Sequence, residues 1–258
     1  LAGRMRAEGR WRLDEPAGLW PTGDARAAIR VEHLLRMLSG LAFSERAALS
    51  DLTRMLYASA DATAYVSARP VAAPPGTRYH YSTGDTVLAC AAMRLRFADD
   101  ADYHRFPHRA LFAPLGMPGA VIETDQAGTF LGGSMVYLRP RHWLRFGRFL
   151  LQDGVWRGTR LLPPGWVAAS REPAPHQEAV DHPWRFGRGL WIDPDRAWLP
   201  DAPPDTFIAW GHQEQFLTVI PSRDLVVLRL GLTREREDWD HNAFLRDVCA
   251  AVAATDRR

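Results

Sequence analysis

One stretch decides how this sequence is interpreted: Pro75-Gly76-Thr77-Arg78-Tyr79-His80-Tyr81-Ser82-Thr83-Gly84-Asp85. It combines a Pro-Gly turn, an aromatic segment and Tyr81-Ser82-Thr83-Gly84, and an apolar run with helical spacing follows it. Tyrosine is an unusual general base because the pKa of its free phenol is about 10. A site that uses one needs a cationic neighbour, usually lysine. None of the 32 basic residues of this chain is a lysine.

Composition limits the classes of protein to consider. The 258 residues are enough for one large domain, and 47% apolar with 24% charged residues is typical of a globular protein. The net charge is only +2 and arginines alternate with acids, so we expect no nucleic-acid partner. The absence of an apolar run of about 18 residues predicts no membrane span. Cys90 and Cys249 are expected to be buried free thiols, and a disulfide between them remains open.

The hydrophobic period changes along the chain. Helical patterns dominate the first part of the chain. We expect helices over residues 1–9, from a cap at 22–24 to Leu38, beginning after a cap at Ser44, beginning at Asp85 or Thr86, ending before Leu111, over residues 141–151, and beginning after Pro163. Residues 60–75 and 171–183 are predicted loops. Short β-rich runs follow at 189–192, 206–210, 216–221 and 225–232, and a helix capped by Asp240 or Asn242 closes the chain. This order predicts an α+β fold with an antiparallel sheet.

Several segments in this order resemble one known group of enzymes, the serine hydrolases of the class C β-lactamase type. That group includes penicillin-binding DD-peptidases, esterases of β-lactamase fold and nylon-oligomer hydrolases. The segments are 8–16, 31–41, 75–88, 111–117, Gly132-Gly133, 143–147, Asp153-Gly154, 161–163, Gly211-His212 and 221–227. The resemblance implies a single domain of β-lactamase/transpeptidase-like fold over 1–258. Within it we expect a mostly helical lobe at 20–165 and the C-terminal part of a sheet lobe, with the closing helix, at 166–258.

The resemblance also implies a Ser-x-x-Lys motif, which this chain lacks. In the family, that serine attacks a carbonyl carbon, and the lysine one turn later shares its proton network. Residues 1–7 resemble the tail of the helix that carries the motif, so we expect the serine two to three turns upstream of Leu1. The chain is then an N-terminally truncated hydrolase without the first strands of the sheet and without activity of its own.

Tyr81 matches the catalytic tyrosine of the family. In that role it takes the proton of the serine and returns it to the leaving group. The alternative is a tyrosine that packs at a turn and bonds a backbone carbonyl. Thr83 occupies the position of an asparagine that orients the substrate, and a hydroxyl cannot offer the donor and acceptor pair of an amide.

His212 occupies the position of the family's Lys-Thr-Gly or His-x-Gly strand. There it can hydrogen-bond the tyrosine oxygen or a substrate carboxylate, and the alternative is a solvent-exposed histidine at a strand edge. The family has glycine where this chain has Glu214, whose carboxylate would oppose an oxyanion if it pointed inward. Gln215 would offer its backbone N–H to the oxyanion, and we also assign Gln213 to substrate binding.

Other candidate residues carry weaker predictions. Tryptophans 184, 191, 198 and 210 could line an acyl-binding cleft but are expected mostly in the core. His104 and His108 have metal-ligand spacing, yet Pro107 favours a surface loop, so no metal and no cofactor are expected. The predicted function is hydrolysis of an ester, amide or β-lactam-like small molecule through an acyl-enzyme. The alternatives are a non-catalytic binding protein of the same fold and a cell-wall DD-peptidase.

Overall fold

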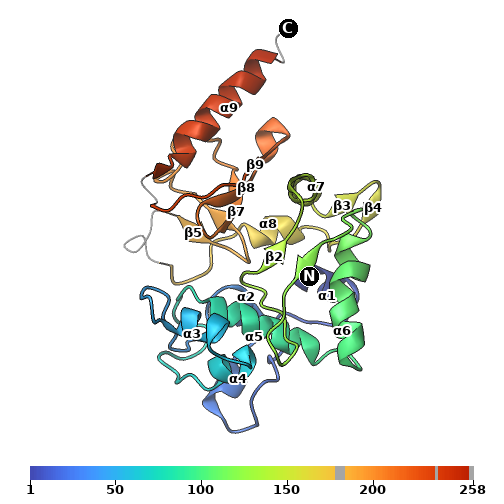
Figure 1. Ribbon diagram of the computed structural model, residues 1–258, viewed down its shortest axis with the longest axis vertical. Coiled ribbons are helices and arrows are strands. Elements are labelled where there is room, and N and C mark those ends of the chain that lie inside the picture. The colour runs from blue at the N-terminus through green and yellow to red at the C-terminus, as the bar shows by residue number, and fades with distance from the viewer. Residues whose placement is uncertain (178–183, 236–237, 256–258) are drawn as a thin grey trace. The chain divides into compact units, whose positions relative to one another are not determined.

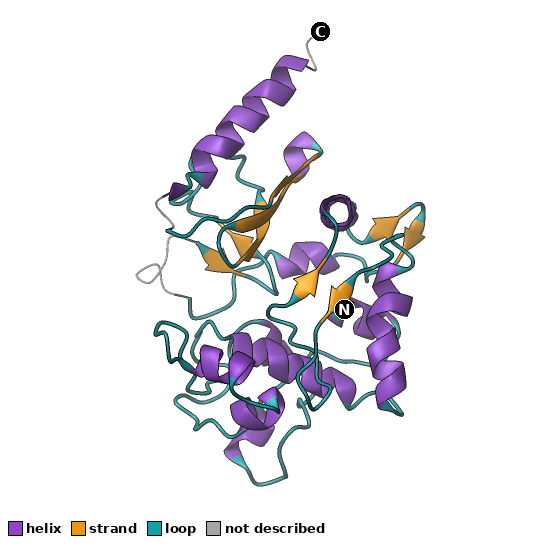
Figure 2. Ribbon diagram, in the orientation of Figure 1, coloured by secondary structure: helices purple, strands orange, loops and turns teal. Residues whose placement is uncertain are grey.

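The computed structural model of the chain describes residues 1–177, 184–235 and 238–255. Two compact units form (Figure 1). The first comprises Leu1–Arg139, Gly158–Pro163 and Ala174–His176, and the second comprises Pro140–Arg157, Pro164–Pro173 and Gln177–Arg258. Helices make up most of the regular structure of the first unit, whereas the large sheet lies in the second (Figure 2). The α+β class is therefore confirmed, and the lobe boundary expected at residue 165 stays a prediction.

The elements of the first unit come mainly from the N-terminal half of the chain. They are α1 (Ala2–Ala7), the 3-10 helix η1 (Ala25–Ala28), α2 (Val31–Leu35), α3 (Asp51–Tyr57), α4 (Ala62–Ser67), α5 (Thr83–Arg94), α6 (Asp100–Pro107), the π-helical turn η2 (His108–Phe112), β1 (Val121–Ile122), β2 (Val136–Tyr137) and β4 (Thr159–Arg160). Strands β1 and β2 pair in antiparallel fashion.

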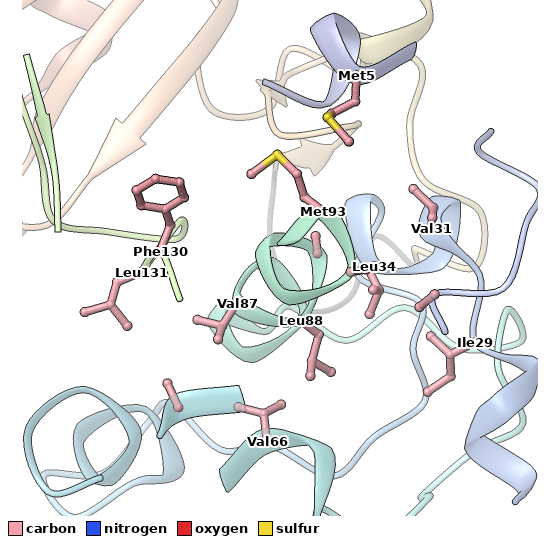
Figure 3. Close-up of a cluster of buried hydrophobic side chains, with 14 of the residues drawn as sticks. Met5, Ile29, Val31, Leu34, Val66, Val87, Leu88, Met93, Phe130 and Leu131 are labelled. Atoms are coloured by element: carbon pink, nitrogen blue, oxygen red, sulfur yellow. The ribbon is translucent and has the colours of Figure 1, made fainter. Parts of the chain in front are cut away.

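Helix α5 is the centre of the first unit's core. Its Val87, Leu88 and Met93 are almost completely buried, and the side chains of neighbouring elements surround it (Figure 3). These neighbours include Met5 of α1, Leu34 of α2, Val66 of α4, and Phe130 and Leu131. Burying a side chain of this size contributes about 1.5–3 kcal/mol. The core therefore fixes the position of α5, and with it the Tyr81 segment that leads into the helix.

Two sequence-based predictions of secondary structure in this unit are wrong. Residues 60–75 are not all loop, because α4 forms there with Asp61 as its N-cap, which accepts from the N–H of Ala64 at 2.8 Å. The predicted helix from residue 24 to Leu38 is interrupted between η1 and α2. At this break Ile29 is extended, and its carbonyl accepts from the N–H of Ala17 at 2.8 Å. Pairing with residues 13–17 replaces the helical hydrogen bonds there.

Two further predictions in this unit are also wrong. Ser44 does not cap the next helix. Ser50 caps α3, whereas the hydroxyl of Ser44 bonds the side chain of Asp51 at 2.9 Å. His104 lies on helix α6 and not in a surface loop: Pro107 is the last residue of that helix, and the π-helical turn η2 follows it directly.

The second unit is built on a five-stranded antiparallel sheet with the order β5-β6-β7-β8-β9. Its elements are α7 (Pro140–Leu151), β3 (Val155–Trp156), α8 (Trp166–Ser170), β5 (Arg185–Phe186), β6 (Trp191–Ile192), β7 (Phe207–Gly211), β8 (Gln215–Ile220), the 3-10 turn η3 (Pro221–Arg223), β9 (Leu225–Arg229) and α9 (His241–Thr255). The predicted strands at 189–192, 206–210, 216–221 and 225–232 correspond to β6 to β9. The predicted loop at 171–183 is confirmed as far as residue 177, and residues 178–183 lie outside the described part.

The sheet of the second unit buries both of its faces. On one face, α7 packs against β8 and β9, and Gly147 allows this because a Cβ there would lie 2.4 Å from Val226 Cγ1. On the other face, Ile208 and Phe216 share a core with Leu245 of α9. Asp240 is the cap of α9, as predicted, and accepts from the N–H of Ala243 at 2.9 Å. Within the described residues, we find no helix with the length and apolar character needed to cross a membrane.

Candidate active site

The Tyr81 segment leads directly into α5. Ser82 is the N-cap, with extended backbone, and its hydroxyl accepts from the N–H of Asp85 at 3.2 Å. The helix therefore begins at Thr83, two residues before the predicted start. The first N–H groups of a helix have no partner within the helix and need acceptors from elsewhere. The N–H of Thr83 finds one outside the segment, since it donates to Glu45 Oε1 at 2.5 Å.

Tyr81 is held as a neutral phenol. Burial raises its pKa to about 12, and the carboxylate of Glu45 adds to this increase. Burial also raises the pKa of Tyr79 well above its usual range. The carboxyl group of Glu45 is partly buried, and this burial raises its pKa in turn, although its hydrogen bonds from Thr83 act in the opposite direction. The surroundings within this unit thus disfavour the phenolate that a tyrosine base would need.

Asp85 organises the backbone on the other side of this segment. Its side chain is almost completely buried, and it accepts from the hydroxyl of Ser39 at 2.6 Å and from the N–H of Ser39 at 3.2 Å. Burial raises the pKa of Asp85 to about 7 despite these hydrogen bonds. Next to Ser39, Gly40 has a φ of +76°, and a Cβ there would lie 2.1 Å from the carbonyl oxygen of Ala73. The Ser-Gly-Leu motif therefore serves to place the Tyr81 segment.

A glycine turn lies against the first two turns of α5. A Cβ on Gly133 would lie 2.5 Å from Thr83 Cγ2, and one on Gly132 would lie 2.4 Å from Cys90 Sγ. Residues 132–134 form a turn that covers Thr83, which is only 7% exposed. The thiol of Cys90 is free, and burial raises its pKa to about 11.

His212 lies at the tip of a hairpin in the second unit. Gly211 of β7 pairs with Gln215 of β8, so His212, Gln213 and Glu214 form the connection. His212 is exposed, whereas Glu214 is buried. Gln213 and Glu214 have φ values of +57° and +64°. A glycine would adopt the conformation of residue 214 without steric cost. This gives a physical reason for the family's glycine at the position that Glu214 occupies in this chain.

The hairpin tip is held by Arg229 on β9. The Arg229 guanidinium donates from Nη1 to the carbonyl oxygens of Gln213 at 3.3 Å and of Glu214 at 2.5 Å, and it lies 4.3 Å from the centre of the Trp239 ring. The side chain of Gln215 donates to the carbonyl of Gly231 and accepts from its N–H at 3.0 Å. These contacts define the backbone that carries His212.

The four tryptophans predicted in the core form one aromatic cluster on the sheet. Trp184 contacts the other three, with ring centres 4.9 Å from Trp198, 5.0 Å from Trp210 and 6.2 Å from Trp191. The imidazole of His241 stacks on Phe216 at 3.8 Å, and Nδ1 accepts from the indole N–H of Trp239 at 3.3 Å. Burial lowers the pKa of His241 to about 4, so this histidine is neutral and structural. A role of the tryptophans in an acyl-binding cleft stays a prediction.

Comparison with known proteins decides the family. The β-lactamase family profile matches residues 1–243 of the chain. The chain belongs to the β-lactamase family. No match was found among functionally curated protein sequences.

Solved structures that superpose on the chain confirm the fold. A 6-aminohexanoate-dimer hydrolase candidate from Bacillus anthracis superposes with a TM-score of 0.77 at 16% identity, covering 97% of this chain and 69% of that one. A β-lactamase from Mycobacterium bovis gives 0.67 at 23% identity, covering 98% and 81%. Simvastatin synthase from Aspergillus terreus gives 0.69 at 17% identity, covering 97% and 80%. At these identities the likeness shows the β-lactamase/transpeptidase-like fold alone.

The structure gathers the predicted residues of this β-lactamase-family chain into two groups, one in each unit. Tyr81 and Thr83 lie together at the start of α5, and His212, Gln213 and Gln215 lie together on the β7–β8 hairpin. Their catalytic and substrate-binding roles stay predictions. Among the described residues, no group of three or more His, Cys, Asp or Glu side chains is placed to hold a metal ion.

Sequence reasoning missed the roles of two carboxylates, Asp85 at the end of the Tyr81 segment and Glu45 outside it. Asp85 had a signal, because an acidic residue three positions after a serine N-cap is typical of a capping box. Glu45 had none, since it lies 38 residues before Thr83 and is brought there by the tertiary fold.

Proposed function

We propose that this chain is the tyrosine-bearing part of a serine hydrolase that cleaves an ester or amide through an acyl-enzyme. Family membership and the placement of Tyr81 at the start of the central helix support the proposal. In it, a serine attacks the carbonyl carbon of the substrate while Tyr81, as the phenolate, accepts the serine proton and then returns it to the leaving alcohol or amine. Water then attacks the acyl-enzyme and gives a proton to the phenolate, which passes it back to the serine as the acid is released.

The high pKa of Tyr81 sets a requirement on the rest of the enzyme. With a pKa of about 12, only about one phenol in 10⁵ is ionised at pH 7. A cation beside the phenol oxygen would lower this pKa, and lysine is the usual choice, yet the 258 residues contain none. We therefore propose that the serine and the lysine of a Ser-x-x-Lys motif come from outside these 258 residues. The 258-residue chain alone is then inactive.

The remaining roles are assigned to the exposed hairpin and to Thr83. In the proposal, His212 binds a substrate carboxylate, and the backbone N–H of Gln215 stabilises the oxyanion. Gln213 contacts the substrate, whereas Thr83, which the glycine turn covers, contributes through the N–H that holds Glu45. The exposure of His212 and the rigid support of the hairpin by Arg229 favour this assignment.

The test uses the protein with whatever residues its gene encodes ahead of Leu1. We expect a Ser-x-x-Lys motif there, labelling of its serine by a fluorophosphonate, and hydrolysis of a p-nitrophenyl ester. Tyr81→Phe should reduce the rate of acylation about 100-fold or more. Tyr79→Phe, which alters a partly buried tyrosine two residues away, is the matched control and should change it little. A gene without the motif, or acylation unaffected by Tyr81→Phe, would refute the proposal.

A second candidate is a non-catalytic binding protein of the same fold. Two observations favour it: Glu214 replaces a glycine with a buried carboxylate side chain, and Tyr81 is held protonated. Such a protein would bind ester or amide analogues with no acyl-enzyme at any substrate concentration. The fluorophosphonate experiment separates the two candidates, because only the hydrolase would be labelled at a serine.

A further inference from the structure

Glu45 is held beside the catalytic tyrosine candidate by two separate contacts. His80 Nε2 donates to the carbonyl oxygen of Phe43 at 2.6 Å, and the N–H of Thr83 donates to Glu45 Oε1 at 2.5 Å. Residues 43–45 therefore run alongside residues 80–83, and Tyr81 lies between the two contacts in sequence. The ring of Phe43 also packs on Gly84, where a Cβ would lie 3.0 Å from it. Glu45 is thus fixed next to Tyr81 by the fold.

No arginine pairs with the carboxylate of Glu45 within the described part of the chain, and the neighbouring His80 lowers its pKa less than burial raises it. Other partly buried carboxylates of the same unit have an arginine: Asp51 pairs with Arg69 at 3.0 Å, and Glu15 pairs with Arg96 at 2.7 Å. The Glu45 carboxylate bonds only Thr83 among the described residues. Partial burial of an unpaired carboxylate is costly, and the raised pKa of Glu45 expresses that cost. A cation supplied by a ligand would offset it.

We propose that Glu45 is a specificity-determining residue that binds an ammonium group of the substrate. The substrate class is then an ester or amide that carries a protonated amine close to the scissile carbonyl. One side of the carboxylate is held by Thr83, and a carboxylate can accept several further hydrogen bonds from such a group. The same negative charge repels substrates with a carboxylate at this position. This inference rests on the proposed function, because it takes the surroundings of Tyr81 as the substrate site.

The test measures ligand binding by the 258-residue chain, which does not require turnover. Three probes share one amide and differ only in the terminal group, which is ammonium, methyl or carboxylate: the N-methylamides of 3-aminopropanoic acid, of butanoic acid and of succinic acid (one carboxyl free). Binding is followed at pH 7 through the ¹³Cζ signal of Tyr81 in tyrosine-labelled protein. We expect the cationic probe to bind about tenfold tighter than the neutral one, and the anionic probe to bind weakest.

Variants identify the residue responsible for the preference. Glu45→Gln keeps an oxygen that can accept from the N–H of Thr83 and should bring the three affinities to within about twofold. Glu123→Gln, which removes an exposed carboxylate of the same unit, should leave the preference intact. Equal binding of the probes by the unaltered chain, no binding of any probe, or a preference that survives Glu45→Gln would overturn the inference.

The proposal of a hydrolase and the proposal of an ammonium site at Glu45 can be refuted independently. A protein that shows the charge preference but never forms an acyl-enzyme would refute the hydrolase and leave the ammonium site intact. A protein that is acylated at a serine, with no charge preference among the probes, would refute only the role of Glu45.

Discussion

Replacing Asp85 with asparagine should change how the stability of the first unit depends on pH. The unfolded aspartate releases its proton near pH 4, whereas the folded, buried Asp85 retains it up to about pH 7. Between these values the native state binds one more proton than the unfolded state, so this group makes the free energy of unfolding fall as the pH rises. The slope is about 1.4 kcal/mol per pH unit over roughly three units, a total of about 4 kcal/mol. Asparagine has no such titration.

The measurement is the difference in unfolding free energy between the unaltered chain and Asp85→Asn from pH 4 to pH 8. Urea unfolding followed by hydrogen exchange of the Thr83–Arg94 peptide reports on α5 itself. We expect the unaltered chain to lose stability relative to the variant up to about pH 7 and then to remain level. Asp24→Asn is the control. Arg26 holds the pKa of Asp24 at about 2, so the stability from its ionised form is lost only below this window.

Two outcomes would contradict this account of Asp85. Parallel stability curves would mean that burial does not raise its pKa. A relative gain in stability as the pH rises through about 4, at the lower edge of this window, would mean that the hydrogen bonds from Ser39 outweigh burial and depress the pKa.

Two further substitutions test the second unit. Gly147→Ala should destabilise it by about 1–3 kcal/mol in urea unfolding, because the added Cβ would overlap Val226, despite alanine's better helix propensity. Arg148→Ala, on the exposed side of α7, is the control, and a Gly147→Ala variant as stable as that control would show that the contact relaxes freely. Arg229→Met should raise hydrogen exchange in residues 211–217, since the carbonyls of the hairpin tip lose a charged donor that contributes about 1.5–3 kcal/mol. Unchanged exchange there would show that the hairpin keeps its shape without Arg229.

The sequence predicted the strands and the family better than the start of the helices. Strands β6 to β9 were visible because each is a short β-rich run between turn residues, and Asp240 was visible as a cap. Helix α4 was missed because it is short and rich in alanine, and its Asp61 cap lies in a polar segment. The interruption before α2 was missed because the pairing of Ile29 with Ala17 is a tertiary contact.

The residues of the candidate site also divide into those with a signal in the sequence and those placed only by tertiary contacts. Tyr81 and Thr83 could be found because residues 75–88 resemble a motif of the family, although the start of the helix was expected at Asp85 or Thr86 and lies at Thr83. Glu45 and Arg229 could not be found, because each reaches its partners only after distant segments fold together. What the structure adds is therefore mainly the charge around Tyr81. A carboxylate lies near the phenol, and the chain contains no lysine.

The central claim is that the surroundings of Tyr81 hold it as a neutral phenol. The most direct test is the pKa of Tyr81 in the 258-residue chain, followed through its ¹³Cζ signal. We predict a value of about 12, and a lower value after Glu45→Gln because a nearby negative charge is removed. A pKa at or below that of free tyrosine, about 10, would contradict the account. The phenol would then be poised as a base without a cation from outside the chain.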